Sequence, residues 1–594
     1  MTPATDAGRS PLRIVRVAGL AAVFAGAGHV LVMGAKSLLL GQFIWSSRDV
    51  VWMAPLGYLL VFGALAVPLA LLAALRPRWV PQAAVVFLYA TAAAFSVALL
   101  FPRIHPIASL LVAIGIGVRS AQSALDAGSG WPRLARSAGG TVAALLALTA
   151  VGMRGMRAWR DDAAWRALPA SADGAPNVLY IILDTVRARN LSLYGYARPT
   201  SPNMARLAAE GVTFDYAFAT TSWTLPSHGS LMTGVDAKEL SAAWFVPLDD
   251  STPVLAERMA ARGYRTGGFV ANHVYTAWES GLARGFHTYE DYLVSLKQVL
   301  LSTSLLQTEL ASELSAARRW SGRLAALRRL NLQVHPAFYS DRKPAERVVD
   351  EFLAWEGLAS NRPYFAFLNF FDPHEPYEPP GRFRTMFGEG KSPEDLYDGS
   401  LAYLDQELGR LADTLRARGT LDRTLVVIVA DHGEHLGDHG IWGHSNSLYE
   451  QLLRVPLIIR FPGRVPAGVR VRQPVSLRDL PVTLLSLADS AAPPSLPGVS
   501  LTGAWQRSDF RGSDILAELR VAGRRKIPPG PSRFGDLHSA VRDSLHLIRN
   551  GDGSEELYDV VRDGEERTNL SASRAAGDSV VTWLRSRLPA TGKK

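Results

Sequence analysis

The pattern of apolar and polar positions divides the chain into two parts. Five apolar runs with very few acidic residues fill the first quarter, at about 12–34, 51–75, 80–101, 104–120 and 137–153. A helix needs about 20 apolar residues to cross a hydrocarbon core of roughly 30 Å. The first three runs reach that length, and the last two are short enough to be re-entrant or tilted. A cleaved signal peptide would explain only the first run. We therefore predict an all-α transmembrane domain of about five spans over residues 1–153.

The remaining sequence alternates between strand and helix patterns. After a polar linker at 154–175, continuous apolar and β-branched runs alternate with amphipathic segments, at 178–183, 364–371 and 424–430. Such runs are typical of strands buried on both faces of a parallel sheet. We predict an α/β domain over 176–490, with a Leu- and Arg-rich helical insertion at 291–345. Residues 491–594 predict a small C-terminal α+β subdomain with antiparallel strands.

Basic residues in the short loops predict the orientation of the membrane domain. If the N-terminus is inside, the cytoplasmic side carries Arg9, Arg13, Arg16, Arg76, Arg78, Arg119, Arg133 and Arg136, against Lys36, Arg48 and Arg103 opposite. An odd number of spans then places everything after residue 153 outside the cytoplasm. Arg154, Arg157 and Arg160 count against this orientation, because they would flank the last span on the outer side. We predict a multi-pass protein of a bacterial inner or plasma membrane, with its second part outside the cytoplasm.

Composition narrows the functional classes. The formal charge of +9 is spread along the chain without a dense basic block, which argues against nucleic-acid binding. Attraction of a basic chain to anionic membrane lipids explains the positive net charge more simply. The absence of cysteine excludes disulfides, thiolate metal ligands and cysteine nucleophiles.

Candidate chemistry gathers at the predicted strand ends. Asp184 and Asp431 each follow an apolar strand, and His432 follows directly on the second. Open α/β sheets build their sites at these ends. Thr224 lies at a predicted helix start, where unpaired amides and the helix dipole favour an anion. Alone, each residue is more often a cap. Together they favour a metal-bound hydroxyl nucleophile.

Several short motifs resemble the sulfatase-like branch of the alkaline phosphatase superfamily. They follow the family order across roughly 178–465: Asp184-Thr185-Val186-Arg187, Tyr194-Gly195-Tyr196, Thr200-Ser201-Pro202-Asn203, the Thr224 stretch, Asp372-Pro373-His374, Asp431-His432-Gly433-Glu434 and Gly443-His444. The preceding spans resemble those of membrane-bound phosphoethanolamine and phosphoglycerol transferases. The resemblance implies an alkaline-phosphatase-like, mostly parallel sheet flanked by helices.

The resemblance also implies residue roles. The metal ligands would be Asp184, Thr224, Asp431 and His432, with Thr224 as the nucleophile. His374 and His444 match positions that hold oxygens of the transferred group or protonate the leaving group. Arg187 lies in the first motif but is not assigned to the substrate.

The nucleophile motif departs from the family pattern. Sulfatases carry Cys or Ser in a Cys/Ser-x-Pro-x-Arg pattern that is converted to formylglycine, and this chain reads Thr224-Leu225-Pro226-Ser227-His228. Threonine is not a precursor of that aldehyde, so no formylglycine is expected. His228 replaces the arginine and would contact the substrate more weakly and with pH dependence. A threonine activated by a metal favours phosphorus over sulfur.

These features leave three functions open. The first is a membrane-anchored, metal-dependent hydrolase of phosphate, phosphonate or sulfate esters, whose candidate substrates include lipid- or glycan-linked esters. The second is a phosphoethanolamine- or phosphoglycerol-type transferase that modifies envelope lipid or glycan. The third is a non-catalytic protein that binds anionic glycan or lipid. His432 makes manganese or zinc the preferred single divalent ion, with calcium or magnesium as alternatives, and a second ion would need His435 and His439. The oligomeric state is not predicted.

Overall fold

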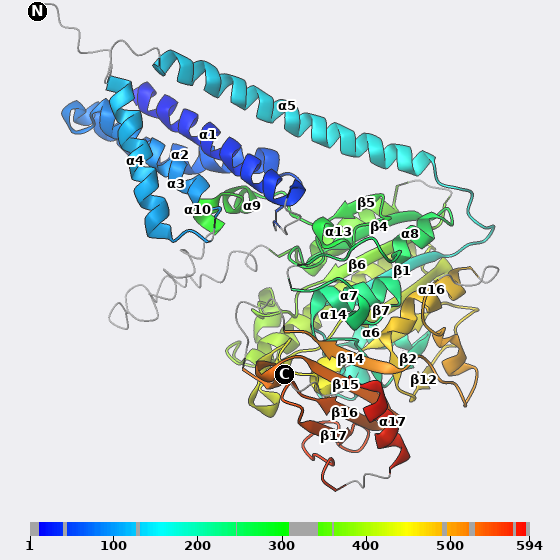
Figure 1. Cartoon of the computed structure of the whole chain (residues 1–594). Coiled ribbons are helices and arrows are strands. Elements are labelled where there is room, and N and C mark those ends of the chain that lie inside the picture. The colour runs from blue at the N-terminus through cyan, green and yellow to red at the C-terminus, as the bar shows by residue number, and fades with distance from the viewer. Residues whose placement is uncertain are drawn as a thin grey trace, which may run out of the picture. The chain divides into compact units, whose positions relative to one another are not determined.

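The structure of the chain is a computed structural model, and it divides into two compact units. It describes residues 11–39, 44, 46–101, 103–125, 131–244, 246–307, 342–358, 362–489, 496–521, 529–573 and 578–589. One unit comprises Met1–Arg160 together with Leu293–Asp341, and the other comprises Asp161–Tyr292 together with Arg342–Lys594 (Figure 1).

The first unit contains the N-terminal helices α1 (Pro11–Leu38), α2 (Val50–Leu75), α3 (Gln82–Ala98), α4 (Pro106–Leu125) and the start of α5 (Trp131–Arg166). Helices α1, α2, α4 and the Ser137–Arg166 part of α5 are long and apolar enough to cross a membrane. Helix α3 has only 17 residues, so it is shorter than the apolar run at about 80–101 from which it was predicted. It begins after Pro81 and ends at Ala98, whereas α4 runs on through a polar last turn to 20 residues.

The start of the predicted insertion packs within this same unit. Helices α9 (Leu296–Leu301) and α10 (Ser304–Gln307) contact α2 and α3. The Tyr58 hydroxyl on α2 donates to Ser304 Oγ at 2.8 Å, and Ser304 donates to the carbonyl of Ser96 on α3 at 2.5 Å. His29 Nδ1 on α1 lies 3.2 Å from the same Tyr58 hydroxyl. Residues 308–341 of the predicted insertion lie outside the described residues.

The second unit is built on an eight-stranded sheet in the order β12-β2-β11-β7-β1-β6-β4-β5. Its strands are β1 (Asn177–Leu183), β2 (Val212–Phe214), β4 (Arg265–Val270), β5 (Thr288–Glu290), β6 (Tyr364–Phe370), β7 (Thr424–Ala430), β11 (Leu457–Arg460) and β12 (Val469–Val471). All neighbours are parallel except β11, which runs antiparallel to β2 and β7. Every residue of β6 and β7 is buried, as their continuous apolar runs predict.

Helices flank this sheet, and shorter strands complete the unit (Figure 1). The helices are α6 (Pro202–Ala209), α7 (Thr224–Thr233), α8 (Leu255–Ala260), α13 (Ala345–Glu356), α14 (Pro393–Ala417), α15 (Glu450–Leu453) and α16 (Leu480–Ala488). The short strands are β3 (Ala217–Phe218), β8 (His435–Leu436), β9 (Trp442–Gly443), β10 (Arg454–Val455) and β13 (Val475–Ser476). The predicted mostly parallel α/β fold is confirmed.

The C-terminal strands form the predicted small antiparallel sheet. Strands β14 (Ile515–Leu519), β15 (Leu537–Arg542), β16 (Leu545–Arg549) and β17 (Glu555–Asp559) pair in sequence order. Helix α17 (Ser579–Arg587) packs on this sheet through Val581 and Leu584, against Ala540, Leu547 and Leu557. Its N-cap Asp578 accepts hydrogen bonds from the amides of Val580 and Val581.

Candidate active site

Three predicted ligands meet at the carboxyl ends of neighbouring strands. Asp184 follows β1, and Asp431 and His432 follow β7, which pairs with β1 in parallel register. All three side chains are fully buried. One ligand atom from each lies within 4.8 Å of the others. Among the described residues, these three form the group whose chemistry and spacing suit a metal ion.

Each of the three residues has one atom held by the protein. Asn272 Nδ2 donates to Asp184 Oδ2 at 2.7 Å, and the His432 amide donates to Asp431 Oδ1 at 2.8 Å. His432 Nδ1 donates to the carbonyl of Gly433 at 2.9 Å, so its Nε2 keeps a lone pair. Asp184 Oδ1 and Asp431 Oδ2 are buried and have no hydrogen-bond partner among the residues described. One carboxylate oxygen from each aspartate and one imidazole nitrogen therefore remain for a cation.

The charges at this position also fit a cation. Burial and the facing Asp431 charge raise the pKa of Asp184 well above its ordinary value, and Glu434 adds to that effect. Two buried carboxylates this close repel each other unless a positive charge lies between them. Thr185, which follows Asp184, has a φ of 59° that is unusual for a β-branched residue. Its amide donates to Asp431 Oδ1 at 3.2 Å, so the strained turn links the two strand ends.

Thr224 is brought to this group by α7. It is the first residue of the helix rather than its N-cap, which is Trp223. Thr224 Oγ1 lies 3.3 Å from His432 Nε2. Ser227, one turn along, donates to the carbonyl of Asp431 at 2.6 Å and so fixes the helix to the end of β7. Gly234 ends the helix with a φ of 77°, a left-handed conformation that glycine adopts readily.

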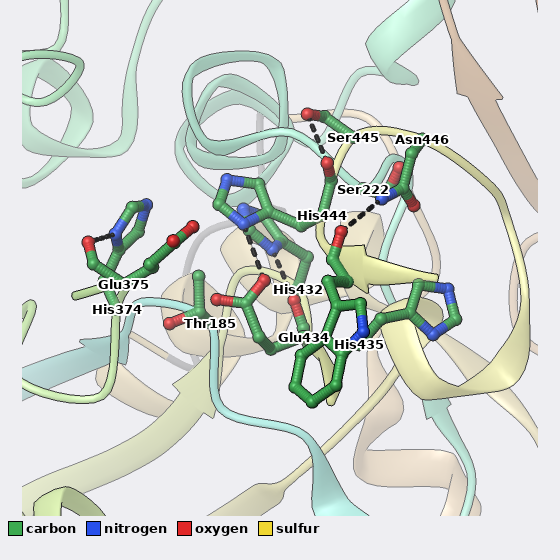
Figure 2. Close-up of polar contacts among 12 residues, drawn as sticks. Thr185, Ser222, His374, Glu375, His432, Glu434, His435, His444, Ser445 and Asn446 are labelled. Carbon is green, nitrogen blue, oxygen red and sulfur yellow. Dashed lines mark hydrogen bonds and ion pairs between the residues drawn. The ribbon is translucent and has the colours of Figure 1, made fainter. Parts of the chain in front are cut away.

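Two further predicted histidines lie beside Thr224 and His432. The ring of His444 lies 4.7 Å from that of His432 and 4.9 Å from that of His374, measured between centroids. His444 Nδ1 donates to Glu434 Oε1 at 2.8 Å, and His374 Nδ1 donates to the carbonyl of Glu375 at 2.6 Å (Figure 2). Each of these two rings is therefore held by the protein through its Nδ1.

The two histidines have opposite electrostatic environments. Burial lowers the pKa of His444, but the charge and hydrogen bond of Glu434 outweigh this, and the net shift is upward. Burial and the neighbouring His444 charge lower the pKa of His374 well below its ordinary value. At neutral pH, His444 is thus the better proton donor, and His374 is neutral.

His228, the predicted substrate contact, has both ring nitrogens directed at the protein. Nδ1 donates to the carbonyl of Thr224 at 2.9 Å and lies 3.4 Å from Asp431 Oδ2. Nε2 lies 3.3 Å from Asn369 Nδ2. Asn369 and Asn272 were not predicted, although a polar residue inside the apolar β6 run was a signal that could have found Asn369.

The remaining candidates lie outside the group of ligand atoms. Arg187 is buried and donates to Asn190, to the carbonyl of Glu434 and to Asp438, which agrees with leaving it unassigned to substrate. His435 bonds Ser447 at 2.8 Å, and the ring of His439 stacks on Tyr449 with centroids 4.0 Å apart. Neither belongs to the metal-ligand group found among the described residues.

Comparisons with known proteins identify the family of this chain. The sequence signature described as Sulfatase matches residues 176–490, which is more than half of the chain. The chain belongs to the sulfatase family. It is an ester-bond hydrolase by that membership. The matched range coincides with the α/β domain predicted from the sequence.

Relatives of known sequence and structure align with more than half of the chain. An arylsulfatase of Clostridium perfringens is 26% identical over 455 residues, with 66% of this chain and 90% of the relative aligned. Human arylsulfatase A is 27% identical over 347 residues, with 55% of this chain and 66% of the relative aligned. The solved phosphonate monoester hydrolase of Agrobacterium radiobacter has a TM-score of 0.51 at 22% identity, and the match covers 67% of this chain and 92% of that one. At that identity, the structural likeness shows the fold alone.

Proposed function

We propose that this member of the sulfatase family is a membrane-anchored, metal-dependent hydrolase that cleaves phosphate, phosphonate or sulfate esters through Thr224, with phosphorus substrates preferred. The observation that carries the proposal is the convergence of Asp184 Oδ1, Asp431 Oδ2 and His432 Nε2 beside Thr224 Oγ1. One ligand atom each from Asp184, Asp431 and His432 lies within 4.8 Å of the other two, and Thr224 Oγ1 lies 3.3 Å from His432 Nε2.

The donor set supports one divalent ion. Asp184, Asp431 and His432 offer two oxygens and one nitrogen, and Thr224 offers a fourth oxygen. The imidazole suits manganese or zinc better than calcium or magnesium, which prefer oxygen throughout. When bound, such an ion would lower the pKa of a ligated hydroxyl and neutralise an approaching anion.

Three side chains have separate roles in the proposed in-line displacement. The Thr224 hydroxyl gives its proton to solvent, and Oγ1 forms a bond to phosphorus as the bond to the leaving-group oxygen breaks, which leaves a phosphothreonine. His444, held by Glu434, donates its Nε2 proton to the leaving oxygen. His374 is neutral, so it can take a proton from the water that later releases the phosphoryl group. The first amides of α7 stabilise negative charge beside Thr224.

The nucleophile residue is the reason for preferring phosphorus. Threonine supplies a single hydroxyl, whereas a formylglycine hydrate supplies two, and this chain contains no cysteine. Nothing else in the motif provides the aldehyde route to sulfate ester cleavage. Preorganised charge rather than covalent chemistry governs phosphoryl transfer, and this buried site is arranged to supply it.

The anchoring part of the proposal rests on the first unit. Among the described residues, four helices are long and apolar enough to cross a membrane, and α3 has 17 residues, which is the lower end of the range for a span. Counting α3 gives five spans and, with the N-terminus inside, a catalytic domain outside the cytoplasm. A periplasmic reporter fused after residue 170 tests this orientation. Reporter activity only in the cytoplasm would reverse it.

Turnover by matched threonine variants tests the catalytic part. Thr224→Ala should lower kcat by at least about 10³-fold on aryl phosphate, aryl phosphonate monoester and aryl sulfate, because the nucleophile is lost. Thr233→Ala, at the other end of the same buried helix, is the control and should leave kcat within a few-fold. Equal product release by Thr224→Ala and the parent would refute the nucleophile assignment. Accurate mass of a trapped Thr224 adduct distinguishes phosphoryl, sulfuryl and larger head groups, the last of which would indicate a transferase.

A further inference from the structure

A buried chain of hydrogen bonds runs beneath the candidate metal site. Asn272 follows β4 and donates through Nδ2 to Asp184 Oδ2 at 2.7 Å. Its backbone amide donates to Asn369 Oδ1, in β6, at 2.9 Å. Asn369 Nδ2 lies 3.3 Å from His228 Nε2, and His228 reaches Thr224 and Asp431. Asn272, Asn369 and His228 are each at most 1% exposed. The chain thus joins the ligand on β1 to the ligand on β7.

The direction of the hydrogen bonds that lead from Asn272 through Asn369 to His228 is fixed by one group that can only donate. The backbone amide of Asn272 requires an acceptor, so the side-chain oxygen of Asn369 must face it. The Asn369 amide nitrogen then faces His228 and donates to Nε2. Nε2 must therefore be the unprotonated nitrogen, and the proton of His228 lies on Nδ1, where it reaches the carbonyl of Thr224. One backbone N–H thereby selects the Asn369 orientation and a neutral His228 tautomer.

The same chain determines which ligand atoms remain for the metal. Asn272 holds Asp184 Oδ2 and leaves Oδ1 without a partner among the described residues. His228 Nδ1 lies within 3.4 Å of Asp431 Oδ2, the atom that the backbone amides of Thr185 and His432 do not hold.

We propose that Asn272, Asn369 and His228 form a positioning relay that orients Asp184 and Asp431 as single-oxygen ligands beneath Thr224. The inference rests on the proposed metal-dependent function and assigns His228 to positioning rather than to substrate contact. Partners of this kind behind metal ligands typically govern metal affinity by 10- to 100-fold.

Metal binding without any substrate tests the relay. Asn369→Asp keeps the shape but removes the donor to His228, and Asn272→Ala removes the donor to Asp184. Titration of metal-free protein with MnCl₂ or ZnCl₂ alone should give a Kd about 10- to 100-fold weaker for each variant than for the parent. Asn550→Asp makes the same chemical change in the C-terminal subdomain, where Asn550 Nδ2 bonds Glu556, and should leave the metal Kd unchanged.

The outcomes separate the relay from the function on which it rests. If the parent binds no metal, the proposed metal centre fails. If the parent binds and both variants bind within about twofold of it, the relay is refuted and the metal centre stands. Melting of the metal-free proteins checks folding: a variant that melts far below the parent without metal, with an unchanged Kd, has a structural role only and overturns the proposal. The double variant Asn272→Ala/Asn369→Asp should lose less than the product of the single losses, because both act through one chain.

Discussion

Asp372, two residues before His374, is a buried carboxylate whose charge destabilises the fold above neutral pH. Oδ1 accepts a hydrogen bond from the amide of Ala345 at 3.1 Å, and Oδ2 is buried without a hydrogen-bond partner among the described residues. Burial raises the pKa of Asp372 to about 6, although Arg342 opposes the shift. We predict that Asp372→Asn makes the protein more stable than the parent at neutral pH.

The sign and size follow from linkage. The unfolded carboxyl loses its proton near pH 3.9, before the folded one does, so the folded state binds more protons between about pH 4 and 6. The stability that protonated Asp372 contributes is fully present below about pH 4 and is lost as pH rises through about 6. Between pH 4.5 and 7 this loss is about 2 kcal/mol. For a unit of this length the unfolding entropy is about 0.8 kcal/mol per degree, so the Tm difference between variant and parent should grow by roughly 2–3 °C.

Thermal melts of both proteins in the same detergent and metal at about pH 4.5 and 7 measure this difference. Metal loss in acid affects both proteins, so it cancels between variant and parent. Asp405→Asn is a contrasting control, since the pKa of Asp405 is also raised to about 6 but its carboxylate accepts from the amides of Asn203 and Met204. Its asparagine should destabilise at both pH values by about 1–3 kcal/mol. A Tm difference for Asp372→Asn that does not change with pH would refute the reasoning.

Three further outcomes are expected. Removing metal with EDTA should lower Tm by about 5 °C, because a ligand at 1,000 times its Kd stabilises the fold by about 4 kcal/mol. The same Tm with and without EDTA would contradict a bound ion. Arg187→Met should cost about 1–3 kcal/mol in urea unfolding, because the partly buried Asp438 loses its ion-pair partner, and the substrate KM should stay within twofold of the parent. A tenfold higher KM at full stability would mean that Arg187 contacts substrate. Tyr58→Phe should lower the free energy of local opening of α10 by about 1–2 kcal/mol, because the hydrogen bond to Ser304 is lost. A single cysteine introduced at Leu305, in a chain with no native cysteine, should then react roughly 5- to 30-fold faster with maleimide than in the parent. An unchanged rate would argue against that hydrogen bond.

The sequence predicted the sheet and the main site positions because both depend on local patterns. Buried parallel strands give continuous apolar runs, and ligands at their ends appear as single acids after those runs, as with Asp184 and Asp431. The helix at Thr224 was also predictable from its proline and its closing glycine. Whether Thr224 is the first helical residue or the N-cap depends on a shift of one residue in the helix start. Such a shift lies within the ordinary ambiguity of helix ends.

The parts that sequence did not predict depend on contacts between distant segments. Asn272 and Asn369 become neighbours only because β4 and β6 pair in the sheet, and a single polar residue gives no indication of its partner. The role of His228 required knowing that Asn369 lies behind it. Helix α3 was predicted too long because an apolar run does not reveal where its helix stops.

The packing of α9 and α10 on the N-terminal helices has a practical consequence for producing the hydrolase in soluble form. Cutting the chain after Arg160 would leave residues 293–307 attached to the catalytic unit with the apolar surface that α2 and α3 normally cover. A water-soluble version therefore requires a second excision, of residues 293–341. The junction is favourable, because Lys343 Nζ donates to the carbonyl of Glu290 at 2.9 Å and so holds the two cut ends close together. A short glycine-serine bridge between Tyr292 and Arg342 would span that gap, leaving every residue of the candidate site in place.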